Sequence, residues 1–153
     1  MDTVQDFEDI LELFSAHDVR YLIVGGLAFI FHAKPRYTKD IDLWIAADAD
    51  NVERANRALD QFGSPVVLSI ADPQEVLQLG VAPNRIDILR ETVALDFEEV
   101  WPRRIVSRYG NVSANWIDLE SLLRIKSRID HPRHQEDARI LRLVLEGRSE
   151  ESS

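Results

Sequence analysis

The sequence predicts an α+β protein of two α/β layers, in which helices flank a small β-sheet and further helices follow it. Three observations support this fold class: apolar residues at helical spacing near the start, short strand-like runs through the middle, and two helical segments at the end. With 153 residues, 45% apolar and 29% charged, the chain has a globular composition and can bury a core. We therefore expect one domain over residues 1–148 and a disordered tail at 149–153.

Helices and strands are expected to alternate in the first half of the chain. Apolar side chains recur at helical spacing in the first helix: Val4, Phe7, Ile10, Leu11 and Phe14. The expected segments are a helix at 3–16, a buried strand at 19–24, a buried helix at about 27–32, a strand at 39–46 and a helix at 51–62. Pro35 ends the second helix, Asp48 or Asp50 can cap the third, and Gly63 terminates it.

The second half combines short strands with helices. Residues 64–70 fit a strand or a loop, whereas Asp72-Pro73 has the cap-then-proline pattern of a helix start. The expected segments are paired strands at 77–81 and 85–90 around a turn at 82–84, a short helix at 95–101, a hairpin of 104–108 and 112–116, and two final helices. Asp118 caps the first of these helices, and the second, at 136–145, ends at Gly147.

Two acids alternate with apolar residues in the segment Asp40-Ile41-Asp42-Leu43. Because side chains on a strand point alternately to opposite faces, Asp40 and Asp42 share one face. Adjacent carboxylates repel, and a shared proton or a bound cation relieves the repulsion. A hard divalent ion such as Mg²⁺ suits these oxygen ligands. A half-solvated edge strand with two surface acids is the alternative interpretation.

A third acid, Asp87, stands between apolar residues on the strand predicted at 85–90. If this strand lies beside the first acid pair, three carboxylates can hold two Mg²⁺ ions, whose remaining coordination sites go to phosphates and an attacking hydroxyl. The pair Gly25-Gly26 opens the buried helix, and glycine lets backbone N–H groups approach an anion at a helix N-terminus. Phosphate on one side and metal on the other indicate nucleotidyl transfer.

In these motifs the sequence resembles the nucleotidyltransferase superfamily with the DNA polymerase β fold. Two small residues open a helix, an acid–apolar–acid motif follows about a dozen residues later, and a third acid stands on a later strand. The chain is most similar to the AbiEii-like and minimal nucleotidyltransferases, which share GG-L-A, here at 25–28, and R-x-T-x-D-I-D-L, here at 36–43. The resemblance covers roughly residues 19–146 and implies a small mixed β-sheet of the nucleotidyltransferase fold, flanked by helices.

The resemblance also implies a role for each candidate site residue. Asp40 and Asp42 would bind both metal ions, and Asp87 would bind the catalytic metal and help to deprotonate the incoming hydroxyl. The residues expected to bind the nucleotide are Gly25, Gly26, Arg36, Lys39 and Lys126. The implied cofactors are two Mg²⁺ ions, with an NTP as substrate. Asp137 could take the place of the acid that follows Lys126 in the family, but the usual lysine before that acid is missing.

Charge is unevenly distributed along the chain. Residues 1–100 hold 8 Lys/Arg against 19 Asp/Glu, whereas residues 101–148 hold 10 against 6. An acidic chain is a poor non-specific nucleic-acid binder, but its basic C-terminal third can attract an anionic substrate. Arg36 and Lys39 either neutralise substrate phosphate or pair with Asp40 and its neighbours. No apolar run approaches the roughly 20 residues that span a bilayer, and cysteine is absent, so we expect a cytoplasmic protein with no membrane partner.

Three functions compete at this point. The first is a Mg²⁺-dependent nucleotidyltransferase that moves NMP from an NTP to a macromolecular hydroxyl, on tRNA or on a protein. The relatives it resembles imply a toxin–antitoxin or phage-defence component, with an antitoxin as a candidate partner. The second keeps the chemistry but modifies a small molecule such as an aminoglycoside. The third is a non-catalytic module of the same fold that binds a nucleotide or a partner, and the retention of all three acids argues against it.

Overall fold

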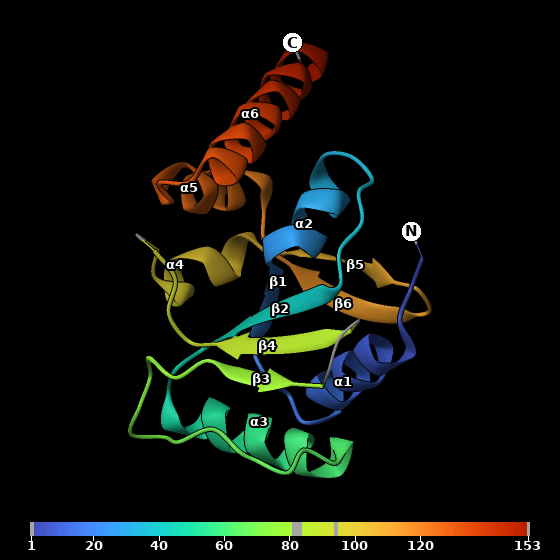
Figure 1. The fold of residues 1–153 in the computed structure, drawn as a ribbon, viewed down its shortest axis with the longest axis vertical. Helices are drawn as coiled ribbons and strands as arrows, with labels where there is room; N and C mark the ends of the chain where they lie inside the picture. The colour runs from blue at the N-terminus through green and yellow to red at the C-terminus, as the bar shows by residue number, and fades with distance from the viewer. Residues whose placement is uncertain (1, 81–83, 94, 153) are drawn as a thin grey trace.

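The computed structural model describes residues 2–80, 84–93 and 95–152, with the backbone alone for 149–152. Its centre is a six-stranded mixed sheet with the strand order β3-β4-β2-β1-β6-β5 (Figure 1). The strands are β1 (Tyr21–Val24), β2 (Asp40–Ile45), β3 (Leu77–Leu79), β4 (Arg85–Leu89), β5 (Ile105–Tyr109) and β6 (Val112–Trp116). The pairs β2–β4 and β1–β6 are parallel, and the other neighbouring pairs are antiparallel.

Helices cover both faces of this sheet. They are α1 (Gln5–Ala16), α2 (Gly25–His32), α3 (Ala49–Phe62), α4 (Phe97–Val100), α5 (Leu119–Arg128) and α6 (Pro132–Ser152), with a 3₁₀ turn at Trp101–Arg103 after α4. Buried residues of α1 and α3 join one core, and those of α4, α5 and α6 join a second core on the opposite face. In Figure 1, α6 rises away from the sheet at the top. The predicted α+β class, with a small mixed sheet flanked by helices and C-terminal helices, is confirmed.

The alternation in β2 decides which side chains face each core. Ile41, Leu43 and Ile45 are fully buried in the core that the sheet shares with α1 and α3. Trp44 belongs to the core on the opposite side, with residues of α4 and α5. Because Asp40 and Asp42 are an even number of residues from Trp44, they lie on that second face. One face of β2 is therefore wholly apolar and buried, and the other carries two carboxylates beside the buried Trp44.

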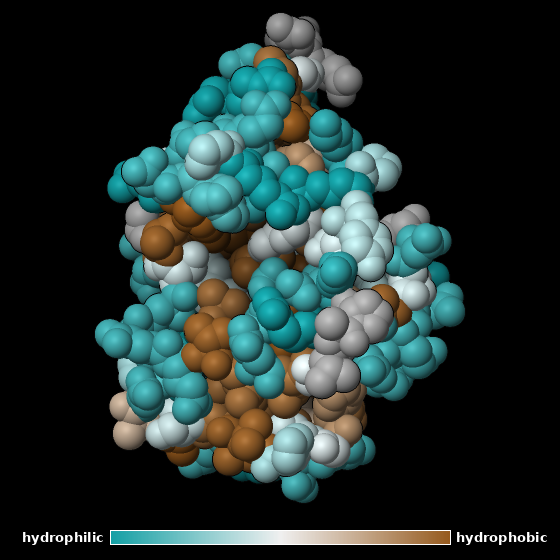
Figure 2. Space-filling model, viewed as in Figure 1, coloured by the Kyte–Doolittle hydropathy of each residue, from teal (hydrophilic) through white to brown (hydrophobic). Residues whose placement is uncertain are grey.

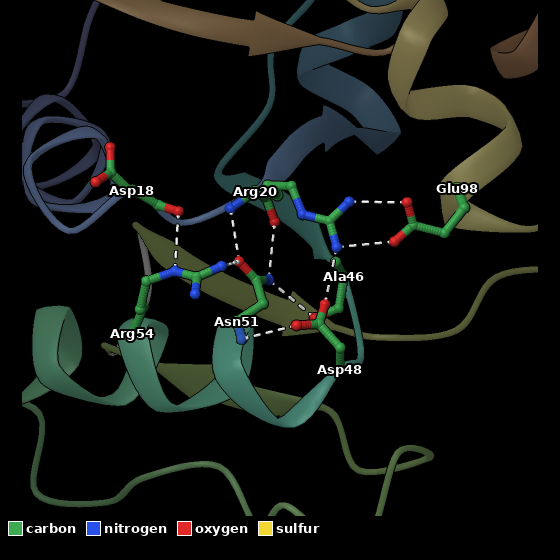
Figure 3. A network of polar contacts seen from close by, with 7 residues as sticks. All are labelled: Asp18, Arg20, Ala46, Asp48, Asn51, Arg54 and Glu98. Atoms are coloured by element: carbon green, nitrogen blue, oxygen red, sulfur yellow. Dashed lines mark hydrogen bonds and ion pairs between the residues drawn. The ribbon is translucent and has the colours of Figure 1, made fainter.

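A fully buried asparagine joins α3 to the ends of two strands (Figure 3). The Asn51 side chain accepts a hydrogen bond from the Arg20 N–H at 2.8 Å and donates to the carbonyl oxygens of Arg20 and Ala46 at 3.1 and 2.9 Å. Arg20 in turn forms ion pairs of 2.8 Å with Asp48 and Glu98. Because buried polar groups are costly without partners, this network sets where β1 begins and where β2 ends.

Several helix ends agree with their sequence signals. Asp48 caps α3 by accepting a hydrogen bond from the Asn51 N–H at 3.1 Å, and Gly63 ends it with φ at +96°. Asp118 caps α5 in the same way, accepting from the Ser121 N–H at 3.2 Å. These helices therefore begin and end where the capping residues predict.

Three other expectations for the second half have different outcomes. β5 and β6 form the predicted hairpin, with Gly110 at φ +58° in its turn. Residues 64–70, which fitted a strand or a loop, contain no strand. The predicted turn at 82–84 lies outside the described residues except for Asn84, and so does Val81, the predicted end of β3.

The predicted helix start at Asp72-Pro73 is wrong. The chain makes a turn there, in which the Glu75 N–H donates to the Asp72 carbonyl at 3.2 Å. The buried guanidinium of Arg90 donates to the carbonyls of Ser69 and Asp72 and pairs with Glu75 at 3.6 Å. These contacts hold the segment as a loop, and β3 begins only two residues after Glu75. Contacts from Arg90, which directly follows β4, therefore prevail over the local helix-start signal of Asp72-Pro73.

The last helix is longer than predicted, because α6 begins at Pro132 and continues through Gly147 to Ser152. A Cβ atom at Gly147 would meet nothing within 4 Å, and its φ is not in the left-handed region. Gly147 therefore does not act as a helix terminator, and the predicted end is wrong. The backbone of residues 149–152, expected to be a disordered tail, continues the helix. Neither α6 nor any other helix in the described ranges is long and apolar enough to cross a membrane.

Replacing Asn51 with alanine should lower the free energy of unfolding by about 2–4 kcal/mol, because buried backbone groups of Arg20 and Ala46 lose their partners. Urea-induced unfolding measures the change. Asn84→Ala removes an exposed amide and should change the same quantity by less than about 0.5 kcal/mol. Equal losses in the two variants would contradict the structural role of Asn51.

Candidate active site

The register of two parallel neighbours, β2 and β4, brings the predicted acids together. Asp42 stands opposite Asp87 in this ladder, and Asp40 stands opposite Arg85. Asp87 is 7% exposed, whereas the Asp40 side chain is 36% exposed at the rim. We call Asp40, Asp42 and Asp87 the acid trio. All three lie on the face of the sheet that α5 and α6 cover, as the strand alternation predicts.

Burial and the neighbouring acids of the trio both act on Asp42. Burial raises the pKa of Asp42 to about 7, and the nearby charges of Asp87 and Asp40, together with a hydrogen bond to Asp87, act in the same direction. The positive charge of Lys126 lowers this pKa and only partly opposes the shift. Two carboxylates this close do not both ionise easily. Near neutral pH, Asp42 therefore exchanges a proton in the absence of a bound cation.

The other two acids of the trio share an arginine. The Arg85 Nε donates to Asp87 Oδ1 at 3.1 Å, and an Arg85 terminal nitrogen lies 3.3 Å from Asp40 Oδ2. The alternation of β4 places Arg85 and Asp87 on the same face, two residues apart. The guanidinium thus bridges the two outer carboxylates of the trio.

Gly25 and Gly26 begin α2 directly after β1, as predicted. Gly25 has φ at +70°, and a Cβ atom there would overlap the Asp42 carboxylate. Glycine is therefore required at this position both for its backbone conformation and for its close approach to Asp42. A Cβ on Gly26 would lie 3.2 Å from Thr38 Oγ1. The N-terminus of α2, whose first backbone N–H groups have no partner within the helix, lies beside the acid trio.

A cavity of about 210 Å³ opens at this point between the sheet and the α5–α6 pair. Gly25, Asp42, Lys126 and His134 line it together with apolar side chains, among them those of Leu89, Leu122, Ile125 and Ile129. Figure 2 shows hydrophobic surface in the hollow beneath the upper lobe that α5 and α6 form. The cavity therefore combines the glycine at the start of α2, the carboxylate of Asp42 and the ammonium group of Lys126 with an apolar wall.

A buried ion-pair network attaches α5 and α6 to the loop before β2. Asp137 accepts hydrogen bonds from the Arg36 guanidinium at 2.7 and 3.0 Å, and it pairs with Lys126 at 3.0 Å. The side chains of Asp137 and Lys126 are only 4% and 5% exposed. Arg36 also stacks on the Phe29 ring, and the Lys126 ammonium lies 3.2 Å from His134 Nδ1. Burial lowers the pKa of Lys126, against the opposing effect of Asp137.

Arg36 and Lys39 thus have different surroundings from each other. Arg36 pairs with Asp137 and not with Asp40, the partner that the sequence left open. Lys39 is exposed and lines a surface depression of about 250 Å³ with Tyr37, Asp40 and Arg133. The structure therefore places Lys39 outside the cavity that holds Gly25, Asp42 and Lys126.

Two parts of the site were missed from the sequence. Arg85 was not considered as a site residue, although its two-residue spacing from Asp87 puts both on one strand face. The partnership of Arg36 with Asp137 was also missed, because 101 positions separate the two residues. The spacing of Arg85 from Asp87 was a sequence signal for the first part, whereas the sequence contains no signal for the pairing of Arg36 with Asp137.

The chemistry of the acid trio fits a hard divalent cation, which prefers carboxylate oxygen ligands. Within the described ranges, however, no group of three or more His, Cys, Asp and Glu side chains is already arranged to hold a metal ion. The Arg85 guanidinium lies against carboxylate oxygens of Asp40 and Asp87. The residues therefore suit Mg²⁺ in kind, and the side chains would have to rearrange to bind it.

Similarity to known proteins is found in solved structures. No protein-family model matches the chain, and no curated protein matches it. The lincosamide antibiotic adenylyltransferase LnuA, in a lincomycin-bound form, superimposes with a TM-score of 0.62 at 18% identity, over 93% of this chain and 98% of that chain. ANT(2″)-Ia, in complex with adenylyl-2″-tobramycin, has a TM-score of 0.60 at 15% identity, over 94% of this chain and 90% of that chain.

A third structure has the same level of similarity. TM1012 from Thermotoga maritima, whose assignment as a nucleotidyltransferase is itself an inference, has a TM-score of 0.60 at 15% identity, over 94% of this chain and 92% of that chain. The chain therefore has the fold of nucleotidyltransferases, and the resemblance found in its motifs is confirmed at that level. At 15–18% identity this similarity establishes the fold and not the substrate. The AbiEii-like sub-group stays a prediction.

Replacing Asp42 with asparagine should raise thermal stability in the presence of EDTA, and more at pH 8 than at pH 5. The folded-state pKa of about 7 lies above the usual 3.8, so the stability that the proton contributes is complete below pH 4 and is lost as pH rises through 7. A shift of this size corresponds to up to about 4 kcal/mol at pH 8.

Thermal unfolding at the two pH values measures this effect. Asp60→Asn, on the exposed face of α3, serves as a control that should show little change at either pH. A stability difference between wild type and Asp42→Asn that is the same at pH 5 and pH 8 would show that Asp42 titrates as an ordinary surface carboxylate.

Replacing Asp137 with alanine should lower the free energy of unfolding by about 3–5 kcal/mol, because it leaves the buried charge of Lys126 without its partner. Chemical denaturation measures the loss. Asp130→Ala removes an exposed acid between α5 and α6 and should be close to neutral. If Asp137→Ala is equally neutral, the buried ion-pair network does not hold the two helices to the sheet.

Proposed function

We propose that this protein is a Mg²⁺-dependent nucleotidyltransferase that transfers NMP from an NTP to a hydroxyl group. The observation that carries the proposal is the acid trio on β2 and β4, of which Asp42 lies against the glycine that opens α2. Carboxylates bind divalent cations, and the N-terminus of a helix binds phosphate. The fold similarity to the adenylyltransferase LnuA, and to ANT(2″)-Ia in complex with adenylyl-2″-tobramycin, supports the same class of reaction.

Each site residue has a role in this proposal. Asp40 and Asp42 would hold both Mg²⁺ ions, and Asp87 would hold the catalytic ion and help to remove the proton of the incoming hydroxyl. Bound Mg²⁺ would supply charge neutralisation at the phosphates and favour an ionised nucleophile. The backbone N–H groups of Gly25 and Gly26 would bind the triphosphate and hold it in line for attack.

The basic side chains would complete nucleotide binding. Lys126 would contribute positive charge from the opposite wall of the cavity, where it already lowers the pKa of Asp42. Lys39 would contact phosphate from the exposed depression beside Asp40. Arg36 would act indirectly, because its guanidinium is engaged by Asp137. This division of roles separates direct phosphate contacts from the buried support behind them.

A macromolecular acceptor, on tRNA or on a protein, is the first candidate. The motif resemblance favours it, together with a toxin–antitoxin or phage-defence role and an antitoxin partner. The depression beside Asp40 supports it, since Lys39 and Arg133 line it with Tyr37, which is 73% exposed. Two cations and an exposed aromatic ring suit a single-stranded nucleic-acid end, whose bases stack on such rings.

A small cationic acceptor, such as an aminoglycoside, is the second candidate. A second cavity, of about 550 Å³, adjoins the cavity lined by Gly25, Asp42 and Lys126, and Thr92 lines both. Its lining includes four acids and two aromatic residues: Asp48, Glu91, Asp96, Glu98, Trp44 and Phe97. Arg90 also lines this cavity, and Asp48 and Glu98 pair with Arg20, so Glu91 and Asp96 supply the remaining acidic groups. An excess of acids attracts an amine-bearing molecule and repels RNA phosphates. Lincomycin and adenylyl-2″-tobramycin are the ligands named for two of the similar structures.

Replacing Asp40 with alanine should reduce nucleotidyl transfer by at least about 100-fold while leaving the fold intact, because it removes a metal ligand and not a core residue. The assay follows label from α-radiolabelled NTPs into an acceptor in the presence of Mg²⁺. Asp50→Ala, on the exposed first turn of α3, is the matched control and should retain full activity. An Asp40→Ala protein that labels acceptors as well as wild type would overturn the mechanism.

The same assay should separate the acceptor classes. If the acceptor is a macromolecule, we expect the label in tRNA or in a protein. If the acceptor is a small cationic molecule, we expect the label in one or more aminoglycosides of a test panel. Wild type that labels none of these acceptors, and that shows no calorimetric heat with NTP and Mg²⁺, would instead identify a non-catalytic module that binds a partner.

A further inference from the structure

We propose that Arg85 is the built-in counter-ion of the acid trio, and that a divalent cation displaces its guanidinium when it binds. The inference rests on the metal site of the proposed function and concerns how this chain controls access to it. It assigns Arg85 a role of its own: it compensates the carboxylates in the metal-free protein and competes with the metal for them.

The strand register positions Arg85 for this role. Arg85 stands directly opposite Asp40 in the β2–β4 ladder and two residues before Asp87 on its own strand. Its guanidinium reaches both acids, at 3.3 Å from Asp40 Oδ2 and at 3.1 and 3.3 Å from the two oxygens of Asp87. The planar fork of an arginine suits carboxylates in this arrangement. The contacts therefore follow from the backbone pairing and need no unusual side-chain path.

The nearby basic side chains do not substitute for Arg85. Lys126 is buried, pairs with Asp137 and has no ion pair with Asp40 or Asp87 among the described residues, although its charge lowers the pKa of Asp42. Lys39 is exposed beside Asp40 and has no ion pair with the acid trio among the described residues. In the metal-free protein, the close contacts that compensate Asp40 and Asp87 thus come from Arg85.

Displacement of Arg85 is favoured because its guanidinium and its pair with Asp40 lie at the rim of the site, although Asp87 itself is nearly buried. The Arg85 side chain is 42% exposed and that of Asp40 is 36% exposed. Ion pairs between exposed side chains contribute little to stability, and the long arginine side chain can turn into solvent. A doubly charged hard cation binds carboxylate oxygens more strongly than one guanidinium does. Arg85 and the metal therefore exclude each other at shared oxygens.

This competition makes a prediction for metal binding without nucleotide. Arg85→Gln should bind Mn²⁺, used as a spectroscopic probe for Mg²⁺, about three- to tenfold more tightly than wild type. Titration of the full chain with Mn²⁺ alone, followed by electron paramagnetic resonance, measures the dissociation constant. In wild type, the NMR signal of the Arg85 Nε–H should shift over the same range of Mg²⁺ concentration.

Two further variants separate displacement from a general effect of charge. Lys39→Gln removes the same charge beside Asp40 without removing a bridge, so it should tighten Mn²⁺ binding less than Arg85→Gln does. Arg85→Lys keeps the charge but loses the fork, so its affinity should lie between those of wild type and Arg85→Gln. Circular dichroism verifies that each variant is folded.

The outcomes distinguish this inference from the proposed function. If wild type binds Mn²⁺ through the acid trio and Arg85→Gln binds it no more tightly, or more weakly, the counter-ion role is wrong while the metal site stands. Equal effects of Arg85→Gln and Lys39→Gln would likewise overturn displacement in favour of a non-specific charge effect. If neither wild type nor Arg85→Gln binds Mn²⁺, the proposed metal-dependent function fails, and this inference fails with it.

Discussion

The parallel pairing of β2 with β4 is the constraint on which the candidate site depends. It sets Asp42 opposite Asp87 and Asp40 opposite Arg85, so the backbone ladder fixes the spacing of the charged groups. The same two strands bury apolar residues on their other face: Ile41, Leu43, Ile86 and Ile88. A slip of one residue would move these side chains into the site and the acids into the core. Hydrophobic burial on one face therefore holds the charges in place on the other.

The C-terminal helices add the second wall of the site. Asp137 connects α6 to Lys126 on α5 and to Arg36 in the loop before β2. A buried ion pair gives little net stability compared with apolar packing, but loss of one partner is strongly destabilising. The network therefore specifies where α5 and α6 sit. Because Lys126 also lines the cavity beside Gly25 and Asp42, the same contacts determine the shape and charge of the pocket.

The sequence predicts features that depend on neighbouring residues and not those that depend on distant ones. Alternation in β2 identified the face of Asp40 and Asp42, and the glycine pair identified the start of α2, because both signals are local. The pairing of Arg36 with Asp137 depends on the docking of α6, which no local pattern encodes. Similarly, Asp72-Pro73 has a valid helix-start signal, but contacts from Arg90 hold that segment as a turn. Tertiary contacts therefore determine the Arg36–Asp137 pair and the turn at Asp72-Pro73.

Charge compensation links the stability of the metal-free fold to the chemistry that we propose. A proton on Asp42, whose pKa burial raises to about 7, and the guanidinium of Arg85, which pairs with Asp40 and Asp87, both reduce the negative charge of the acid trio. Lys126, the buried lysine nearby, pairs with Asp137 and also lowers the pKa of Asp42, so it compensates the acid trio only in part. In the mechanism that we propose, these contacts would balance part of the negative charge of the acid trio until a divalent cation replaces them.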